Sequence, residues 1–267
     1  MSDVTLDPSD GGRRDTAPPL AGPPVVGHMA EVREHVAEVR EHVAEVKDHV
    51  VEQIAHVKPL LRGWLHEIFF FLSIPAGLLL VALSSTVEAR LAAAVYSLGV
   101  TALYGVSSAY HRGPWTEKGR VVMRRLDHAM IFVLIAATYT PFCLLLVDGP
   151  LSWIFLGAIW AVALTGLVLA LTGISMKYGI GFILYIALGW AAVLAMPRLL
   201  DVMTPFQLGL MVAGGLLYTV GAIFLATRWP DPFPKVFGYH EVWHVMTVVA
   251  GICLAVDIWM LSLNAGA

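Results

Sequence analysis

The chain has 267 residues, of which 58% are hydrophobic and only 14% are charged, and its formal net charge is −3. Soluble domains carry about 25% charged residues, so the composition excludes an ordinary soluble protein and indicates an integral membrane protein. The net charge itself says little about partners, but no feature of the sequence suggests nucleic-acid binding, and we expect no nucleic acid partner. The charge is unevenly placed: residues 1–57 hold 11 of the 20 acidic residues but 5 of the 17 basic ones.

Residues 1–29 are rich in proline, glycine and aspartate and contain no apolar stretch of the kind found in a signal peptide. Such a composition cannot bury enough apolar surface to offset the entropy of ordering. The sequence therefore predicts a disordered, cytoplasmic N-terminus over residues 1–29.

A seven-residue repeat, Ala-Glu-Val-Arg-Glu-His-Val, begins at Ala30 and decays after Val50. Its valines are separated by alternating gaps of four and three, the spacing of a coiled-coil seam, which predicts an amphipathic helix over residues 30–61. Two interpretations are left open: self-association into a homo-oligomer, or a helix lying on the cytoplasmic leaflet. Histidines one repeat apart lie about 10.5 Å apart along a helix, too far to share a metal ion within one chain. They are His35, His42, His49 and His56.

Residues 62–267 are predicted to form an all-α bundle of seven transmembrane helices. Apolar segments near the required ~20 residues alternate with short loops, and in lipid such segments must be helical to satisfy their backbone polar groups. The predicted spans are Trp64–Ser84, Leu91–Tyr110, Leu126–Val147, Leu151–Thr172, Tyr178–Met196, Phe206–Ala226 and Glu241–Leu263.

The basic residues of the loops predict the orientation. The loops after spans two, four and six hold eight lysines and arginines, whereas the loops after spans one, three and five hold two. Because basic residues concentrate on the cytoplasmic side, the N-terminus is predicted inside and, with seven spans, the C-terminus outside. We expect a multi-pass protein of the plasma or inner cell membrane.

Three histidines fall where apolar segments meet the loops assigned to the cytoplasm. His111 ends span two, and His240 and His244 begin span seven, four residues apart and therefore on one helical face. Three nitrogen ligands leave a fourth position for water, an arrangement typical of catalytic zinc. Asp127, which opens span three, is placed to hold or deprotonate that water, and Ser107 to hydrogen-bond within the site.

Other polar residues near this level allow alternatives. His240-Glu241-x-x-His244 also matches the zincin pattern, in which the glutamate is the general base; alternatively, Glu241 lies in a first helical turn, where its charge suits the helix dipole. Glu67, Glu241 and His128 are candidates for the surroundings of the metal. Taken singly, His66 and His128 are interpreted as polar caps at the membrane interface.

Over roughly residues 62–263 the chain resembles the hemolysin III family, relatives of the progestin and adipoQ receptors in a superfamily that includes alkaline ceramidases. The resemblance rests on Ser107-x-x-x-His111, on the stretch from Leu126-Asp127-His128 to Pro141-Phe142, and on His240-Glu241-x-x-His244. It implies a seven-helix bundle with zinc on the three histidines, completed by Asp127 and Ser107, and it suggests hydrolysis of lipid amides.

The leading hypothesis is therefore a zinc-dependent membrane hydrolase of lipid amides, with a membrane lipid as partner and its acyl chain between spans three, five, six and seven. One alternative is a non-enzymatic sensor or regulator of membrane lipids with a structural zinc. Another is a hemolysin III-like cytolytic protein.

Overall fold

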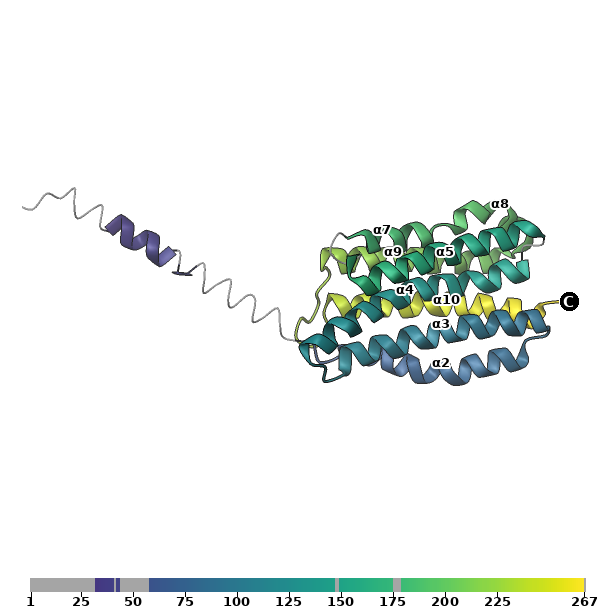
Figure 1. Ribbon diagram of the computed structural model, residues 1–267, viewed down its shortest axis with the longest axis horizontal. Helices are drawn as coiled ribbons and strands as arrows, with labels where there is room; N and C mark the ends of the chain where they lie inside the picture. Colours follow the sequence, from purple (N-terminus) through teal and green to yellow (C-terminus); the bar gives the residue numbers. More distant parts are fainter. Residues whose placement is uncertain (1–31, 41, 44–57, 147–148, 175–178, 267) are drawn as a thin grey trace, which may run out of the picture. The chain divides into compact units, whose positions relative to one another are not determined.

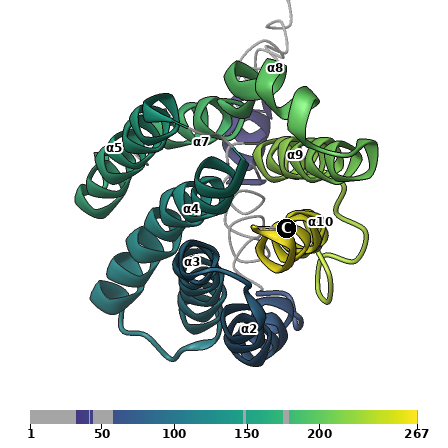
Figure 2. The same ribbon diagram turned by 90° about the vertical axis from the view of Figure 1, so that its right-hand side faces the viewer.

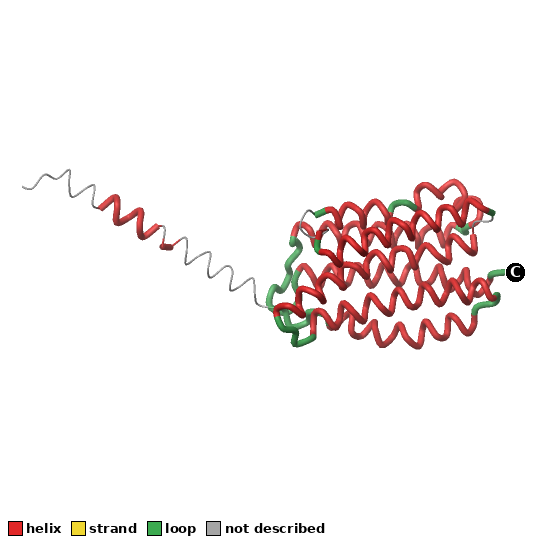
Figure 3. The backbone as a smooth tube through the Cα atoms, viewed as in Figure 1, coloured by secondary structure: helices red, strands yellow, loops and turns green. Residues whose placement is uncertain are grey.

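The computed structural model describes residues 32–40, 42–43, 58–146, 149–174 and 179–266, and these residues are almost entirely helical (Figures 1 and 3). Residues 1–57 and 58–267 form two separate units. The predicted disordered segment 1–29 lies outside the described residues. The helices of the second unit are α2 (Trp64–Leu83), α3 (Val87–Arg112), α4 (Glu117–Leu146), α5 (Pro150–Thr172), α7 (Ile180–Gly189), α8 (Ala192–Val202), α9 (Pro205–Thr227) and α10 (Tyr239–Asn264).

The first unit is helical over 32–40 and 42–43, within the predicted heptad helix, and the remainder of the repeat up to residue 57 lies outside the described residues. Residues 58–61, which the heptad pattern includes, form the turn that leads into α2. The backbone N–H groups of Leu60 and Leu61 each donate a hydrogen bond of 3.1 Å to the loop before α10. These hydrogen bonds tie the turn to the loop before α10, and the boundaries predicted for the heptad helix stay a prediction.

Seven spans in the described residues are long and apolar enough to cross a membrane, which confirms the predicted fold and the multi-pass membrane location. The third span is longer than predicted, because α4 begins at Glu117 and carries its basic residues on a helical extension of the apolar segment. The orientation of the termini remains a prediction from the loop charges.

The fifth span is made of two helices, α7 and α8, separated by a turn at Trp190 and Ala191. Such a break frees backbone polar groups, which must find partners inside a membrane. The hydroxyl of Tyr139, on α4, accepts a hydrogen bond of 2.7 Å from the backbone N–H of Ala192 and lies 3.0 Å from the carbonyl oxygen of Leu188. One tyrosine from a neighbouring helix thus stabilises the break.

The end-on view shows how the bundle is arranged (Figure 2). Helices α2, α3, α4 and α5 pack in sequence, each against the next, and α9 packs along α10. Helix α10 also contacts α2, α3 and α4, so the last span closes the bundle against the first three. This closure brings the start of α10 beside the end of α3 and the start of α2.

Candidate metal centre

The structure brings together the three histidines that the sequence predicted as ligands. One ring nitrogen from each of His111, His240 and His244 can be chosen so that all three lie within 4.8 Å of one another, and the Nε2 atoms of His111 and His240 are 3.1 Å apart. Three nitrogens bound tetrahedrally to one ion at ~2.1 Å would lie about 3.4 Å apart. The three side chains could therefore hold a single metal ion after small ring adjustments.

The ligands lie at helix ends because α3 stops and α10 starts at this level. His111 occupies the last turn of α3, which ends at Arg112, and His240 and His244 occupy the first two turns of α10. His111 and His244 are buried. Ionisable side chains are rarely buried within a transmembrane bundle unless they have a function. A cluster of buried histidines therefore indicates a functional site.

Glu241, between the two histidines of α10, is fully engaged in structural contacts. One carboxylate oxygen accepts a hydrogen bond of 2.8 Å from the backbone N–H of Gly238, which caps the helix, and the other accepts one from the side chain of Arg62. This geometry favours the first-turn interpretation of Glu241 over its role as a zincin-type base.

Residues 58–63, which we call the strap, join the two helix ends that carry the ligands. The Lys58 ammonium donates a hydrogen bond to the carbonyl oxygen of His111, and Arg62 contacts Glu241. Gly63 has a φ of +83°, and a Cβ atom there would lie 2.6 Å from that of His111, so only glycine fits. Partial burial, followed by the nearby guanidinium groups, foremost Arg120, lowers the pKa of Lys58.

Glu67, a sequence candidate for the surroundings of the metal, pairs with the residue that follows His111. Its carboxylate forms an ion pair with the Arg112 side chain, whose guanidinium lies 4.0 Å from the ring centroid of Trp64. Glu67 therefore acts on the site through the end of α3.

Asp127 and Ser107 lie together at the cavity that adjoins the histidines. Ser107 is buried, and an Asp127 carboxylate oxygen lies 3.9 Å from Nδ1 of His128. Both line the same cavity as His240 and His244. His128 lines it too, with Nδ1 2.7 Å from the carbonyl oxygen of Arg124 and a side chain that is 36% exposed.

His66 belongs to this site, although the sequence analysis interpreted it as an interfacial cap. Its ring stacks on that of His244, with centroids 3.8 Å apart and planes 8° from parallel. Its Nε2 is 3.5 Å from the hydroxyl oxygen of Thr247, which in turn donates to the carbonyl oxygen of His244 at 2.8 Å. The available signal was its position: spans one and seven start on the same side of the membrane, so His66 and His244 share one level.

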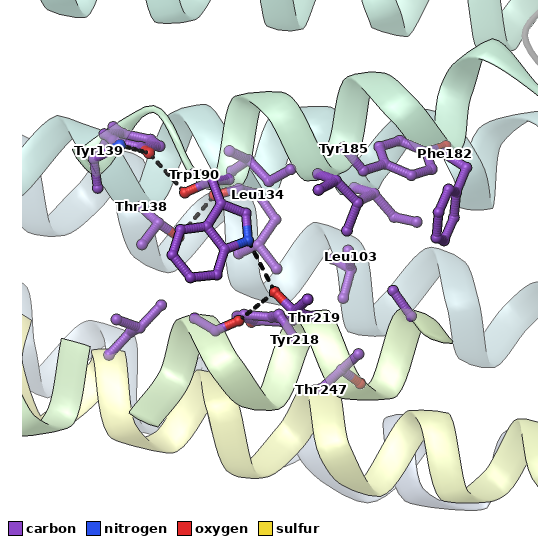
Figure 4. Close-up of a pocket in the computed structure, with 18 of the residues that line it drawn as sticks. Leu103, Leu134, Thr138, Tyr139, Phe182, Tyr185, Trp190, Tyr218, Thr219 and Thr247 are labelled. Atoms are coloured by element: carbon purple, nitrogen blue, oxygen red, sulfur yellow. Dashed lines mark hydrogen bonds between the residues drawn. The ribbon is translucent and has the colours of Figure 1, made fainter. Parts of the chain in front are cut away.

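A cavity of about 520 Å³ is lined at one end by His66, His240 and His244 and extends into the membrane-spanning part of the bundle. Figure 4 shows part of its wall. Beyond its polar end the wall is mostly aliphatic and aromatic, a lining typical of small-molecule sites. The wall comes mostly from α3, α4, α7, α8, α9 and α10 and the turn between α7 and α8, with residues such as Leu103, Leu134, Phe182, Tyr185, Trp190 and Tyr218. The cavity thus has, at one end, histidines of a cluster that could hold a metal ion, and an apolar interior.

The fold and the site define a multi-pass membrane protein with a three-histidine centre at one end of a seven-helix bundle. The family model described as "Haemolysin-III related" matches residues 54–255, most of the chain. The chain therefore belongs to the haemolysin III-related family, as its motifs predicted.

Curated relatives agree with this assignment. The chain is 35% identical over 189 residues to "Hemolysin-3" of Bacillus cereus, covering 68% of this chain and 82% of the relative. It is 29% identical over 182 residues to "Hemolysin-3 homolog" of Bacillus subtilis, covering 67% and 82%. It is 26% identical over 196 residues to human "Monocyte to macrophage differentiation factor", covering 71% and 79%, which supports the link to the wider receptor superfamily.

Proposed function

We propose that the protein is a zinc-dependent integral membrane hydrolase that cleaves a lipid amide at the cytoplasmic end of the bundle. The observation that carries the proposal is the juxtaposition of three histidine nitrogens within 4.8 Å and a mostly apolar cavity lined by two of those histidines, His240 and His244. Three neutral nitrogen donors suit zinc and leave a position open for chemistry.

The chemistry divides between the ion and the residues around it. When bound, zinc would polarise a carbonyl group and make water more acidic. Hydrolysis adds water across the amide C–N bond and yields a fatty acid and an amine. Asp127, oriented by Ser107, would take a proton from the attacking water and return one to the departing nitrogen.

The cavity suits a lipid with one polar group and one long tail. On α4 its lining residues run from Asp127 to Cys143, which is about 24 Å of helix. The polar head would lie against the histidines, Asp127 and Ser107, and the acyl chain between α4, α7, α9 and α10. This is where the sequence analysis placed the chain, because spans three, five, six and seven are rich in Phe, Leu and Gly.

The test uses purified full-length protein in lipid nanodiscs. Metal content is measured by mass spectrometry, and fatty-acid release is measured from a ceramide-like lipid. We expect stoichiometric zinc and release by the wild type, whereas Asp127→Asn keeps zinc and loses release. Zinc retention by the wild type without any release from a panel of lipid amides would overturn the hydrolase and favour a structural ion.

A non-enzymatic sensor is the second candidate, and the strap favours it. The strap contacts the ends of both helices that carry the three histidines, through Lys58 and Arg62. A change in the conformation of the strap would therefore reach the metal centre through few bonds. If the protein is a sensor, Arg62→Gln should change the metal affinity, and neither the variant nor the wild type should hydrolyse lipid. A cytolytic activity is suggested only by the names of the Bacillus relatives, and haemolysis by the purified protein tests it.

A further inference from the structure

The N-terminal helix presents an apolar stripe that the proposed hydrolase does not use. In the described ranges 32–40 and 42–43, the four valines of the repeat are 48%, 47%, 53% and 61% exposed. They are Val32, Val36, Val39 and Val43. Exposed apolar side chains at coiled-coil spacing indicate a helix whose partner is another helix.

The repeat sorts its other residue types by heptad position. With the valines at a and d, the basic residues Arg33 and Arg40 fall at e, and His35 and His42 fall at g. The acidic residues in these described ranges, Glu34 and Glu38, fall at f and c, on the side away from the seam. The two positions that flank a coiled-coil seam are therefore basic on one side and histidine on the other.

We propose that this helix packs in parallel against the same helix of a second copy of the chain, and that acidification separates the two. Copies inserted in one membrane with the same orientation carry their N-terminal segments on the same side, which allows a parallel arrangement. An antiparallel pair would instead place e positions opposite e positions. Arg33 and Arg40 of the two copies would then lie together and repel one another.

In the parallel pair, each g residue lies beside the e residue of the next heptad on the partner helix. His35 thus faces Arg40 of the second copy. A neutral imidazole can accept a hydrogen bond from the guanidinium, whereas a protonated imidazole repels it. Imidazole groups change charge between about pH 5 and 8, so association weakens as the pH falls through that range.

Acidic residues oppose this effect but do not reverse it. On its own helix, His35 Nδ1 lies 3.5 Å from Glu38, with side chains 82% and 69% exposed, and an exposed pair contributes little. The acidic residues at the outward c and f positions of one helix lie roughly 15 Å or more from the same positions of the partner helix. That distance exceeds the ~8 Å screening length at physiological salt. The residues at e and g, beside the seam, therefore decide whether acidification weakens or strengthens association.

Full-length protein labelled at the N-terminus with donor and acceptor dyes tests the proposal in liposomes by energy transfer at about pH 8 and pH 5.5. We expect roughly two- to fivefold weaker association at the acidic pH, because a symmetric pair of helices gains two like-charge contacts between His35 and Arg40. In Arg40→Glu, His35 faces a carboxylate of the second copy, so acidification strengthens association and the pH dependence reverses.

Two further variants separate this seam from contacts between membrane domains. Val36→Asp/Val43→Asp puts charge in the seam and should abolish association at both pH values, while Glu34→Gln, at an outward f position, should behave like the wild type. Association of the double aspartate variant at wild-type strength would overturn the proposal. So would stronger association of the wild type at acidic pH.

Discussion

Within the described ranges, buried polar side chains have interaction partners at the start of α10 but not near its end. At its start, His244 stacks on His66 and Glu241 is held by Gly238 and Arg62. Towards its other end, Asp257 is fully buried, and neither of its carboxylate oxygens has a hydrogen-bond partner in the described part of the chain. The polar groups at the start of α10 therefore have partners on α2, on α3 and in the strap, whereas Asp257 has none in the described residues.

Removing a metal ligand should have the largest effect. His244→Ala deletes one of three nitrogens and the ring on which His66 stacks, and we expect zinc affinity to fall at least about a hundredfold, because even partners of ligands contribute ten- to hundredfold. Competition with a fluorescent chelator measures the affinity. The control is His128→Ala, which alters the same cavity outside the triad and should bind zinc nearly as the wild type does. Unchanged binding by His244→Ala would contradict the assignment of the ligands.

Breaking the capped ion pair at the start of α10 should come next. Glu241→Ala leaves Arg62 without its partner and the helix without its cap, so we expect the free energy of unfolding to fall by about 3 kcal/mol. Thermal unfolding in detergent measures it. A cycle with Arg62→Ala shows whether the two residues act together, and strictly additive losses would refute the coupling.

The same kind of deletion at the other end of α10 should have the opposite sign. Asp257→Leu replaces an unpartnered buried carboxyl with an apolar side chain, so we expect the free energy of unfolding to rise by about 1–3 kcal/mol. The same unfolding assay applies, with zinc binding as a check that the site is intact. A destabilised Asp257→Leu protein would show that the carboxyl has a partner or ligand that stabilises it.

The smallest effect is expected at the break in the fifth span. Tyr139→Phe removes the hydroxyl that bonds the backbone on both sides of Trp190, with an expected loss of about 1–2 kcal/mol. Tyr96→Phe, a matched substitution on α3, should change the unfolding temperature less. Equal shifts for the two variants would mean that the hydroxyl of Tyr139 does not stabilise the break.

Patterns that extend along the chain were predictable from the sequence. Apolar segment length gave the number of spans, since the thickness of a bilayer sets that length whatever the neighbours. Loop charge then placed His111, His240 and His244 at one level, because topology alone decides on which side each helix end lies. Their convergence needed only that α3 and α10 be neighbours.

Features that depend on which side chains face one another were decided by the tertiary structure. Three contacts join residues from segments that are distant in the sequence. His66 stacks on His244, Arg62 pairs with Glu241, and the Tyr139 hydroxyl bonds the backbone at the break in span five. Hydropathy and spacing describe one helix at a time, so they carry no record of such pairs. Helix packing sets the rotation of each span about its axis, and that rotation determines which polar groups find partners and which, like Asp257, do not.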